Sequence, residues 1–80
     1  MLTDYLRAAM HRATYKMYPE DGTFWGEIPG LQGVWANRET LEACRDELEE
    51  VLEDWILIGV RLGHRLPVVD GIDLNERASV

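Results

Sequence analysis

The stretch TLEACRDELEEVLEDWILIGVRL, from Thr40 to Leu62, carries the longest continuous pattern in the chain. Its apolar residues recur at spacings of three and four, which places them along one side of an α-helix, while acidic residues fall mostly on the other side. The apolar set is Leu41, Cys44, Leu48, Val51, Leu52, Trp55, Ile58 and Leu62. At about 1.5 Å of rise per residue, such a helix is roughly 34 Å long and can cover one face of a small sheet. We therefore expect the rest of the chain to pack against it.

Both ends of this predicted helix carry residues that begin and end helices. The Thr40 side chain can cap the first turn, and Glu42 places a negative charge near the positive end of the helix dipole. Gly63 follows the last periodic residue, where glycine commonly ends a helix. Residues 55–60 are apolar almost all round, which predicts a second packing layer over the last two turns. This run is too short to cross a bilayer, which needs about 20 apolar residues.

Three short segments before the helix have the alternation and the turns of an antiparallel sheet. Residues 13–18, 23–28 and 34–36 are the predicted strands. Proline and glycine in 19–22 close a hairpin between the first two strands, and the turn 29–33 separates the second from the third. The segments predict a three-stranded antiparallel meander that the long helix covers.

The two ends of the chain extend this α+β prediction. Residues 1–12 form a short amphipathic helix, with Thr3 or Asp4 near its start, that docks on the apolar end of the long helix or on an open sheet face. Residues 65–69 form a short fourth strand at a sheet edge, because Pro67 has no N–H to donate. The predicted order is helix, three strands, helix, strand. It forms a single domain over 1–80, with its core in 13–69, a turn at Asp70-Gly71 and a frayed tail in 75–80.

The composition limits the classes of partner. Eight Lys and Arg stand against fifteen Asp and Glu, for a formal net charge of −7, which disfavours nucleic acid and favours basic partners, unless the charge serves solubility alone. A chain of this size buries only about 60% of its unfolded surface, so we expect a homo-oligomer, either dimer or tetramer. The N-terminus shows no export signal, so we expect a cytoplasmic protein that does not engage a membrane.

The residues most often used in catalysis or metal binding have structural explanations here. The single cysteine, Cys44, lies on the apolar side of the long helix and is predicted to be a core residue. His11 and His64 are far apart in sequence and lack neighbouring ligands, and the acids at 70–73 lack the spacing of a calcium loop. We therefore predict no catalytic residues, no metal and no cofactor. A metal-dependent hydrolase that uses clustered carboxylates remains an alternative.

The strand alternation separates two sets of side chains. Phe24, Ile28, Val34 and Ala36 are expected to face the long helix. Trp25 and Trp35 then project from the opposite face, on neighbouring strands. The sequence allows two explanations of what covers these tryptophans. One is a structural cover, either the N-terminal helix or a second subunit, and the other is a partner protein.

The segments EDGTFWGEIPGLQGVWA (20–36) and TLEAC (40–44), with Leu66-Pro67 after the helix, resemble the HicB antitoxin family over about residues 13–69. The resemblance implies a partial ribonuclease H fold without that enzyme's catalytic acids. It also implies a small basic partner, a HicA-like mRNA interferase toxin whose active site the antitoxin blocks. The matching turn and cap residues are expected to determine the fold and not to form a site. They are Gly22, Pro29, Gly30, Gly33 and Thr40.

The sequence therefore predicts a HicB-like antitoxin domain that neutralises a small basic ribonuclease and is not itself an enzyme. The predicted partner-binding residues are Glu20, Asp21, Trp25, Glu27 and Trp35. Many HicB proteins carry a C-terminal DNA-binding segment, but this chain reaches Val80 without a basic recognition segment, so we expect no direct DNA binding. The alternative from another class is an oligomeric interaction domain without a toxin partner.

Overall fold

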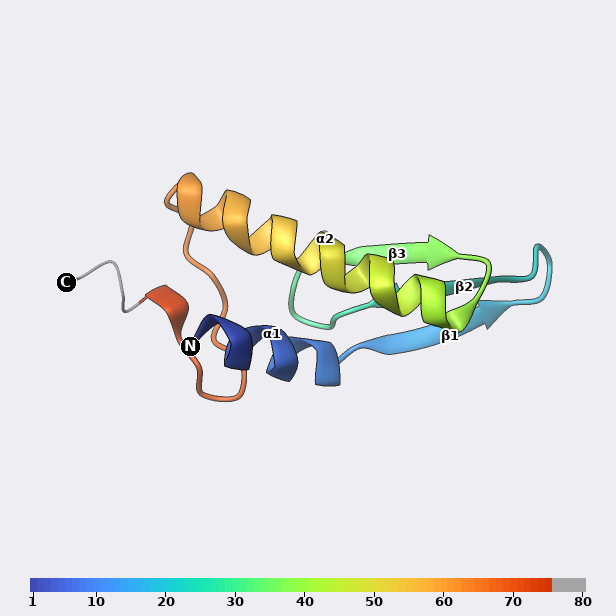
Figure 1. The fold of residues 1–80 in the computed structure, drawn as a ribbon, viewed down its shortest axis with the longest axis horizontal. Helices are drawn as coiled ribbons and strands as arrows, with labels where there is room; N and C mark the ends of the chain where they lie inside the picture. The colour runs from blue at the N-terminus through green and yellow to red at the C-terminus, as the bar shows by residue number, and fades with distance from the viewer. Residues whose placement is uncertain (76–80) are drawn as a thin grey trace.

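A computed structural model describes residues 1–75 as two helices and three strands (Figure 1). The elements in order are α1 (Leu2–His11), β1 (Thr14–Tyr18), β2 (Thr23–Glu27), β3 (Trp35–Arg38) and α2 (Leu41–Arg61). The strands form one antiparallel sheet in the order β1-β2-β3, and α2 packs across one of its faces. The predicted α+β class and the order of its first five elements are confirmed.

Two consecutive turns connect β2 to β3. The Leu31 N–H donates to the Ile28 carbonyl at 3.1 Å, and the Val34 N–H donates to the Leu31 carbonyl at 3.2 Å. Gly30 and Gly33 occupy the third position of each turn with φ of 88° and 92°. This conformation is that of type II turns, where glycine avoids the steric cost of a positive φ. Because the second turn includes residue 34, β3 begins at Trp35, one residue later than predicted, and ends at Arg38, two residues later.

The core lies between the sheet and α2, and it extends to α1 and to the segment after α2. Its fully or nearly fully buried hydrophobic members are Tyr5, Ala9, Ile28, Leu31, Val34, Ala36, Cys44, Leu48, Leu52, Ile56, Leu66 and Val69. Burial raises the pKa of the Cys44 thiol, and its Sγ donates to the Ala36 carbonyl at 3.5 Å. Cys44 is therefore a core residue, as predicted.

Helix α2 begins as its sequence indicates, but its last turns are not enclosed. Thr40 is the N-cap, and its Oγ1 accepts a hydrogen bond from the Ala43 N–H at 3.1 Å. The predicted second packing layer is wrong within the single chain, because α1 and the segment after α2 cover only the side that carries Ile56 and Gly59. The side chains left 55–62% exposed are Leu57, Ile58, Val60 and Leu62. Among the described residues, no helix combines the length and the apolar character needed to span a membrane.

Helix α1 docks beside the C-terminal half of α2 and not on the open face of the sheet (Figure 1). Tyr5 is fully buried and its hydroxyl donates to the Pro67 carbonyl at 2.7 Å, while Arg12 pairs with Asp70 at 3.0 Å. Docking on the apolar end of the long helix is thus confirmed, and the idea that α1 covers the tryptophans is wrong. The helix begins at Leu2 without a side-chain cap, and Thr3 and Asp4 lie near its start, as predicted.

The predicted fourth strand over 65–69 does not form. Both backbone polar groups of Leu66 bond to the Asn75 side chain, at 2.8 and 2.6 Å, and Pro67 has no N–H for a ladder. The remaining pairing is a bridge between Val69 and Ile72 around the predicted Asp70-Gly71 turn. Asn75 is therefore part of the structure and not of a frayed tail, while residues 76–80 of the predicted tail lie outside the described residues.

Candidate partner-binding face

The face of the sheet opposite α2, called here the open face, is uncovered within residues 1–75. The strand register places Lys16 and Asn37 beside Trp25, and Trp35 beside Glu27. Directly paired residues of antiparallel strands share a face. The open face consists of Thr14, Lys16, Tyr18, Thr23, Trp25, Glu27, Trp35 and Asn37.

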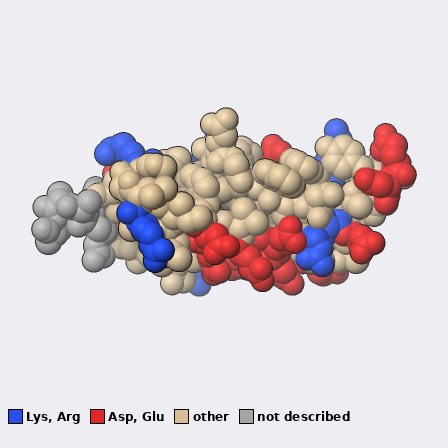
Figure 2. All heavy atoms as spheres, turned by 90° about the horizontal axis from the view of Figure 1, so that it is seen from above, with Lys and Arg blue, Asp and Glu red and all other residues tan. Residues whose placement is uncertain are grey.

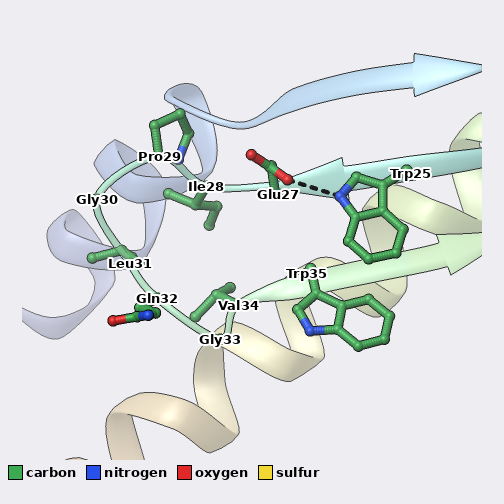
Figure 3. Close-up of a pocket in the computed structure, with 10 residues that line it drawn as sticks. All are labelled: Trp25, Glu27, Ile28, Pro29, Gly30, Leu31, Gln32, Gly33, Val34 and Trp35. Atoms are coloured by element: carbon green, nitrogen blue, oxygen red, sulfur yellow. Dashed lines mark hydrogen bonds between the residues drawn. The ribbon is translucent and has the colours of Figure 1, made fainter.

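The two tryptophans of the open face stack on each other (Figure 3). Their ring centroids are 4.6 Å apart and their planes differ by 6°, a separation and tilt that correspond to an offset stack. Trp35 remains 50% exposed. Trp25 is fixed by a second contact, since its Nε1–H donates to Glu27 Oε1 at 2.8 Å. The stack is therefore a rigid aromatic surface in contact with solvent.

A depression of about 430 Å³ lies between this stack and the β2–β3 loop. Trp25, Glu27 and Trp35 line it together with residues 28–34, and Figure 3 shows the loop curving beside the two indoles. Glu27 is the one charged residue in this lining. The depression therefore combines aromatic surface with a single negative charge.

The hairpin end of the open face has different chemistry. Lys16 places its Nζ 5.5 Å from the centroid of the Tyr18 ring, a cation–π contact. The Asn37 amide donates to Thr23 Oγ1 at 3.0 Å and to the Phe24 carbonyl at 2.9 Å. These contacts hold the polar side chains of the open face in place and direct the one cation of this face toward Tyr18.

The predicted site residues fall into two groups. Trp25, Glu27 and Trp35 meet, whereas Glu20 and Asp21 lie in the β1–β2 turn at the end of the sheet. Asp21 Oδ1 accepts from the Thr23 hydroxyl at 2.7 Å and from the Thr23 N–H at 3.1 Å. These bonds hold the pKa of its carboxyl below the ordinary value. Asp21 therefore stabilises the turn, and Glu20 is an exposed acid beside it.

Sequence reasoning missed all β1 members of the open face, and Asn37 of β3, as part of the site. Lys16, Tyr18 and Asn37 were not predicted to border the tryptophans. The signal that could have found them is the alternation in 14–18 combined with the hairpin, since the pairing of residues 18 and 23 sets Lys16 opposite Trp25.

A second charged surface runs along α2. Figure 2 shows acidic side chains gathered in a band, with more at the hairpin end of the molecule. Those on α2 are exposed: Glu42, Asp46, Glu49, Glu50, Glu53 and Asp54. In the part of the chain that the structure describes, no three His, Cys, Asp or Glu side chains are grouped as metal ligands.

Known proteins resemble this chain both in sequence and in fold. The model of a protein family described as UPF0150-like matches residues 4–67. The crystal structure of TTHA0281 from Thermus thermophilus is similar, with a TM-score of 0.85 and 38% sequence identity over 91% of this chain and 90% of that one. No curated protein matches the chain.

Proposed function

The chain belongs to the UPF0150-like family, and from this premise we propose that it acts as a HicB-type antitoxin domain. In this role it binds a small basic mRNA interferase in the cytoplasm and covers the active site of that toxin. The observation that carries the proposal is the open face, where the Trp25–Trp35 stack and Glu27 are exposed together. The resemblance of residues 20–36 and 40–44 to HicB antitoxins supports it.

The physical properties of this face suit a protein partner. Binding energy in interfaces concentrates in a few central residues, among which tryptophan is enriched, and a stacked pair loses little side-chain freedom when a partner covers it. The net charge of −7 favours encounter with a basic ribonuclease through electrostatic steering. In this binding mode the tryptophans contribute most of the affinity, while the acidic residues raise the association rate and orient the basic partner.

The test is inhibition of a candidate toxin. The chain is co-expressed with a small basic HicA-like ribonuclease from the same source, and mRNA cleavage is measured against the ratio of the two proteins. We expect suppression at a stoichiometric ratio. Trp35→Ala should weaken inhibition by about 30-fold, the effect of losing a typical interface hot spot.

A matched pair of charge reversals shows where the partner binds. Glu27→Lys changes the open face, and Glu49→Lys makes the same charge change on α2, across the sheet. We expect only Glu27→Lys to weaken inhibition strongly. The proposal fails if the unmodified chain leaves cleavage unchanged, or if Trp35→Ala inhibits as well as the original protein.

A second candidate function is a homo-oligomeric interaction domain without a toxin partner. A groove of about 510 Å³ between α1 and the end of α2 is lined by apolar side chains and one acid, and Leu57 and Val60 beside it are 60% and 61% exposed. Two copies with the same negative charge repel each other least where charge is sparse. The residues lining the groove are Met1, Leu2, Leu6, Glu53, Ile56, Leu57, Val60 and Leu74.

Light scattering distinguishes this candidate. We expect an oligomer whose mass is a multiple of 9.2 kDa and which Leu57→Ser with Val60→Ser reduces to single chains. Leu41→Ser is the control, since Leu41 is also exposed but lies at the other end of α2. A single-chain mass for the unmodified protein contradicts this candidate.

A further inference from the structure

We infer that the depression between the indole stack and the β2–β3 loop receives an arginine side chain of a basic protein partner. Its guanidinium is recognised by the Trp25–Trp35 surface and by the Glu27 carboxylate. The inference deepens the proposed function and rests on it for the existence of a basic partner. Its geometry comes from the open face alone.

The Glu27 carboxylate carries the one charge that lines the depression. Its side chain is exposed, and within residues 1–75 it forms no ion pair. Lys16, the cation of the open face, is directed to the Tyr18 ring. The Trp25 indole bonds to Oε1 of Glu27, which leaves Oε2 for a further donor. The carboxylate is thus positioned by one tryptophan, and Lys16, which lines a neighbouring depression together with it, forms no ion pair with it.

Glu27 limits which kind of partner can cover the depression. Any protein surface that closes over the depression removes water from Glu27, and a buried carboxylate is costly unless a cation pairs with it. An apolar partner leaves that charge unpaired, and a nucleic acid backbone brings further negative charge toward a chain of net charge −7. The partner group that satisfies the carboxylate is a cationic side chain.

The exposed indole beside Glu27 favours arginine over lysine. A guanidinium is planar, is weakly hydrated, and stacks on an aromatic face while it donates to a carboxylate. Trp35 offers a half-exposed indole next to Glu27 in the register of the sheet, and its stacking on Trp25 holds it in place. Indole and carboxylate side by side fit a flat cation better than the compact ammonium of lysine.

The test uses peptides, so that it does not depend on a toxin. Acetylated tetra-arginine amide is titrated into the intact protein, with tetra-citrulline of the same length as the neutral, planar control. Binding is followed by the indole N–H signals in two-dimensional NMR. We expect tetra-arginine to shift the signals of Trp25 and Trp35 and to leave Trp55, on α2, unchanged. Tetra-citrulline should shift none of them.

Variants locate the charge that matters. Glu27→Gln keeps an oxygen acceptor for the Trp25 indole and removes the charge, and we expect affinity to fall about tenfold, as for the loss of one charge-assisted contact. Trp35→Leu should reduce affinity similarly through loss of the cation–π contact. Glu49→Gln, an equal loss of charge on α2, should change it less than twofold.

The inference is overturned if tetra-citrulline shifts the same signals as strongly, or if Glu49→Gln weakens binding as much as Glu27→Gln. It is also overturned if light scattering shows a dimer that Trp35→Leu dissociates, because a second copy then occupies this face. Failure of peptide binding with intact toxin inhibition removes the inference alone. Peptide binding without inhibition of any candidate toxin removes the proposed function alone.

Discussion

At the scale of single residues, Gly26 fixes how closely the sheet approaches α2. A Cβ at this position would lie 2.9 Å from two ring atoms of Tyr15 and 3.0 Å from Cys44 Sγ. Gly26 is buried in the central strand, and Tyr15 packs against the core, so an added Cβ would have to displace the ring from that packing. The absence of a side chain here is therefore a requirement of packing and not of backbone conformation.

We expect Gly26→Ala to destabilise the protein by about 1–3 kcal/mol, the usual cost of overpacking a core. Urea unfolding measures the change in the free energy of unfolding. In a Tyr15→Leu background, where the ring is absent, the cost of Gly26→Ala should shrink, because contacting residues couple. An equal cost in both backgrounds contradicts this explanation.

Asp21 gives a residue-scale prediction about acidity. Thr23 lowers the pKa of the Asp21 carboxyl below 3.8, first through its hydroxyl and then through its backbone N–H. Because the folded-state pKa is depressed, the associated stability is present above the unfolded-state pKa and is lost as pH falls through the folded-state value. Thr23→Val should raise the pKa toward 3.8 without fully restoring it, as an NMR titration of the Asp21 carboxyl carbon measures. Thr14→Val, on β1, should leave it unchanged.

At the scale of elements, α1 is held by contacts from a distant part of the chain. A helix of this length is marginal alone, and Tyr5 and Arg12 connect it to residues near the C-terminal end. We expect Tyr5→Phe to cost about 1 kcal/mol, because it removes one hydrogen bond and leaves the Pro67 carbonyl without it. Hydrogen exchange should become faster in α1 and stay unchanged in the sheet. Tyr18→Phe, on the open face, is the matched control and should alter neither.

Helix α2 carries like charges at unfavourable spacing. Glu50 lies four residues from both Asp46 and Asp54, and such pairs destabilise a helix by about 0.2–0.5 kcal/mol each. Glu50→Lys turns both pairs into attractive ones, so it should stabilise the protein by roughly 0.8–2 kcal/mol at low salt. Thermal unfolding at low and high ionic strength measures this gain, which salt should reduce. If Glu50→Lys does not raise the stability at low salt, the proposed repulsion between these acids is contradicted.

Most elements follow from local sequence, and the exceptions have distant causes. The period of α2 and its Thr40 cap predicted its bounds within one residue, and prolines and glycines located the turns. The segment 65–69 looked like a strand, but the side chain of Asn75 occupies the backbone groups of Leu66. A partner nine residues away, bonding through a side chain, leaves no trace in alternation or propensity.

At the scale of the whole molecule, the sheet has one packed face and one open face. Alternation predicted that Trp25 and Trp35 would leave the core together, and they do. It did not predict the stack or the bond to Glu27, which depend on the register that the β2–β3 loop imposes. The predicted partner-binding set also grouped Glu20 and Asp21 with the tryptophans, although the turn places these acids at the end of the sheet.

The net charge gives a prediction for the molecule as a whole. Under the proposed function, the rate of association with a basic toxin should fall by about tenfold or more between low and high salt, since screening removes long-range steering. The dissociation rate should change far less. Stopped-flow mixing, followed by tryptophan fluorescence, measures both rates. An association rate independent of salt contradicts steering by the acidic surface.

The docking of α1 also sets an order of events during synthesis. Helix α1 is made well before its anchors, since the Tyr5 hydroxyl donates to the Pro67 carbonyl 62 residues later and Arg12 pairs with Asp70 58 residues later. Until they emerge, the apolar side of α1 lacks these anchors while the hairpin and α2 can already associate. A released chain truncated after residue 66 should therefore protect the sheet from protease while α1 remains cleavable.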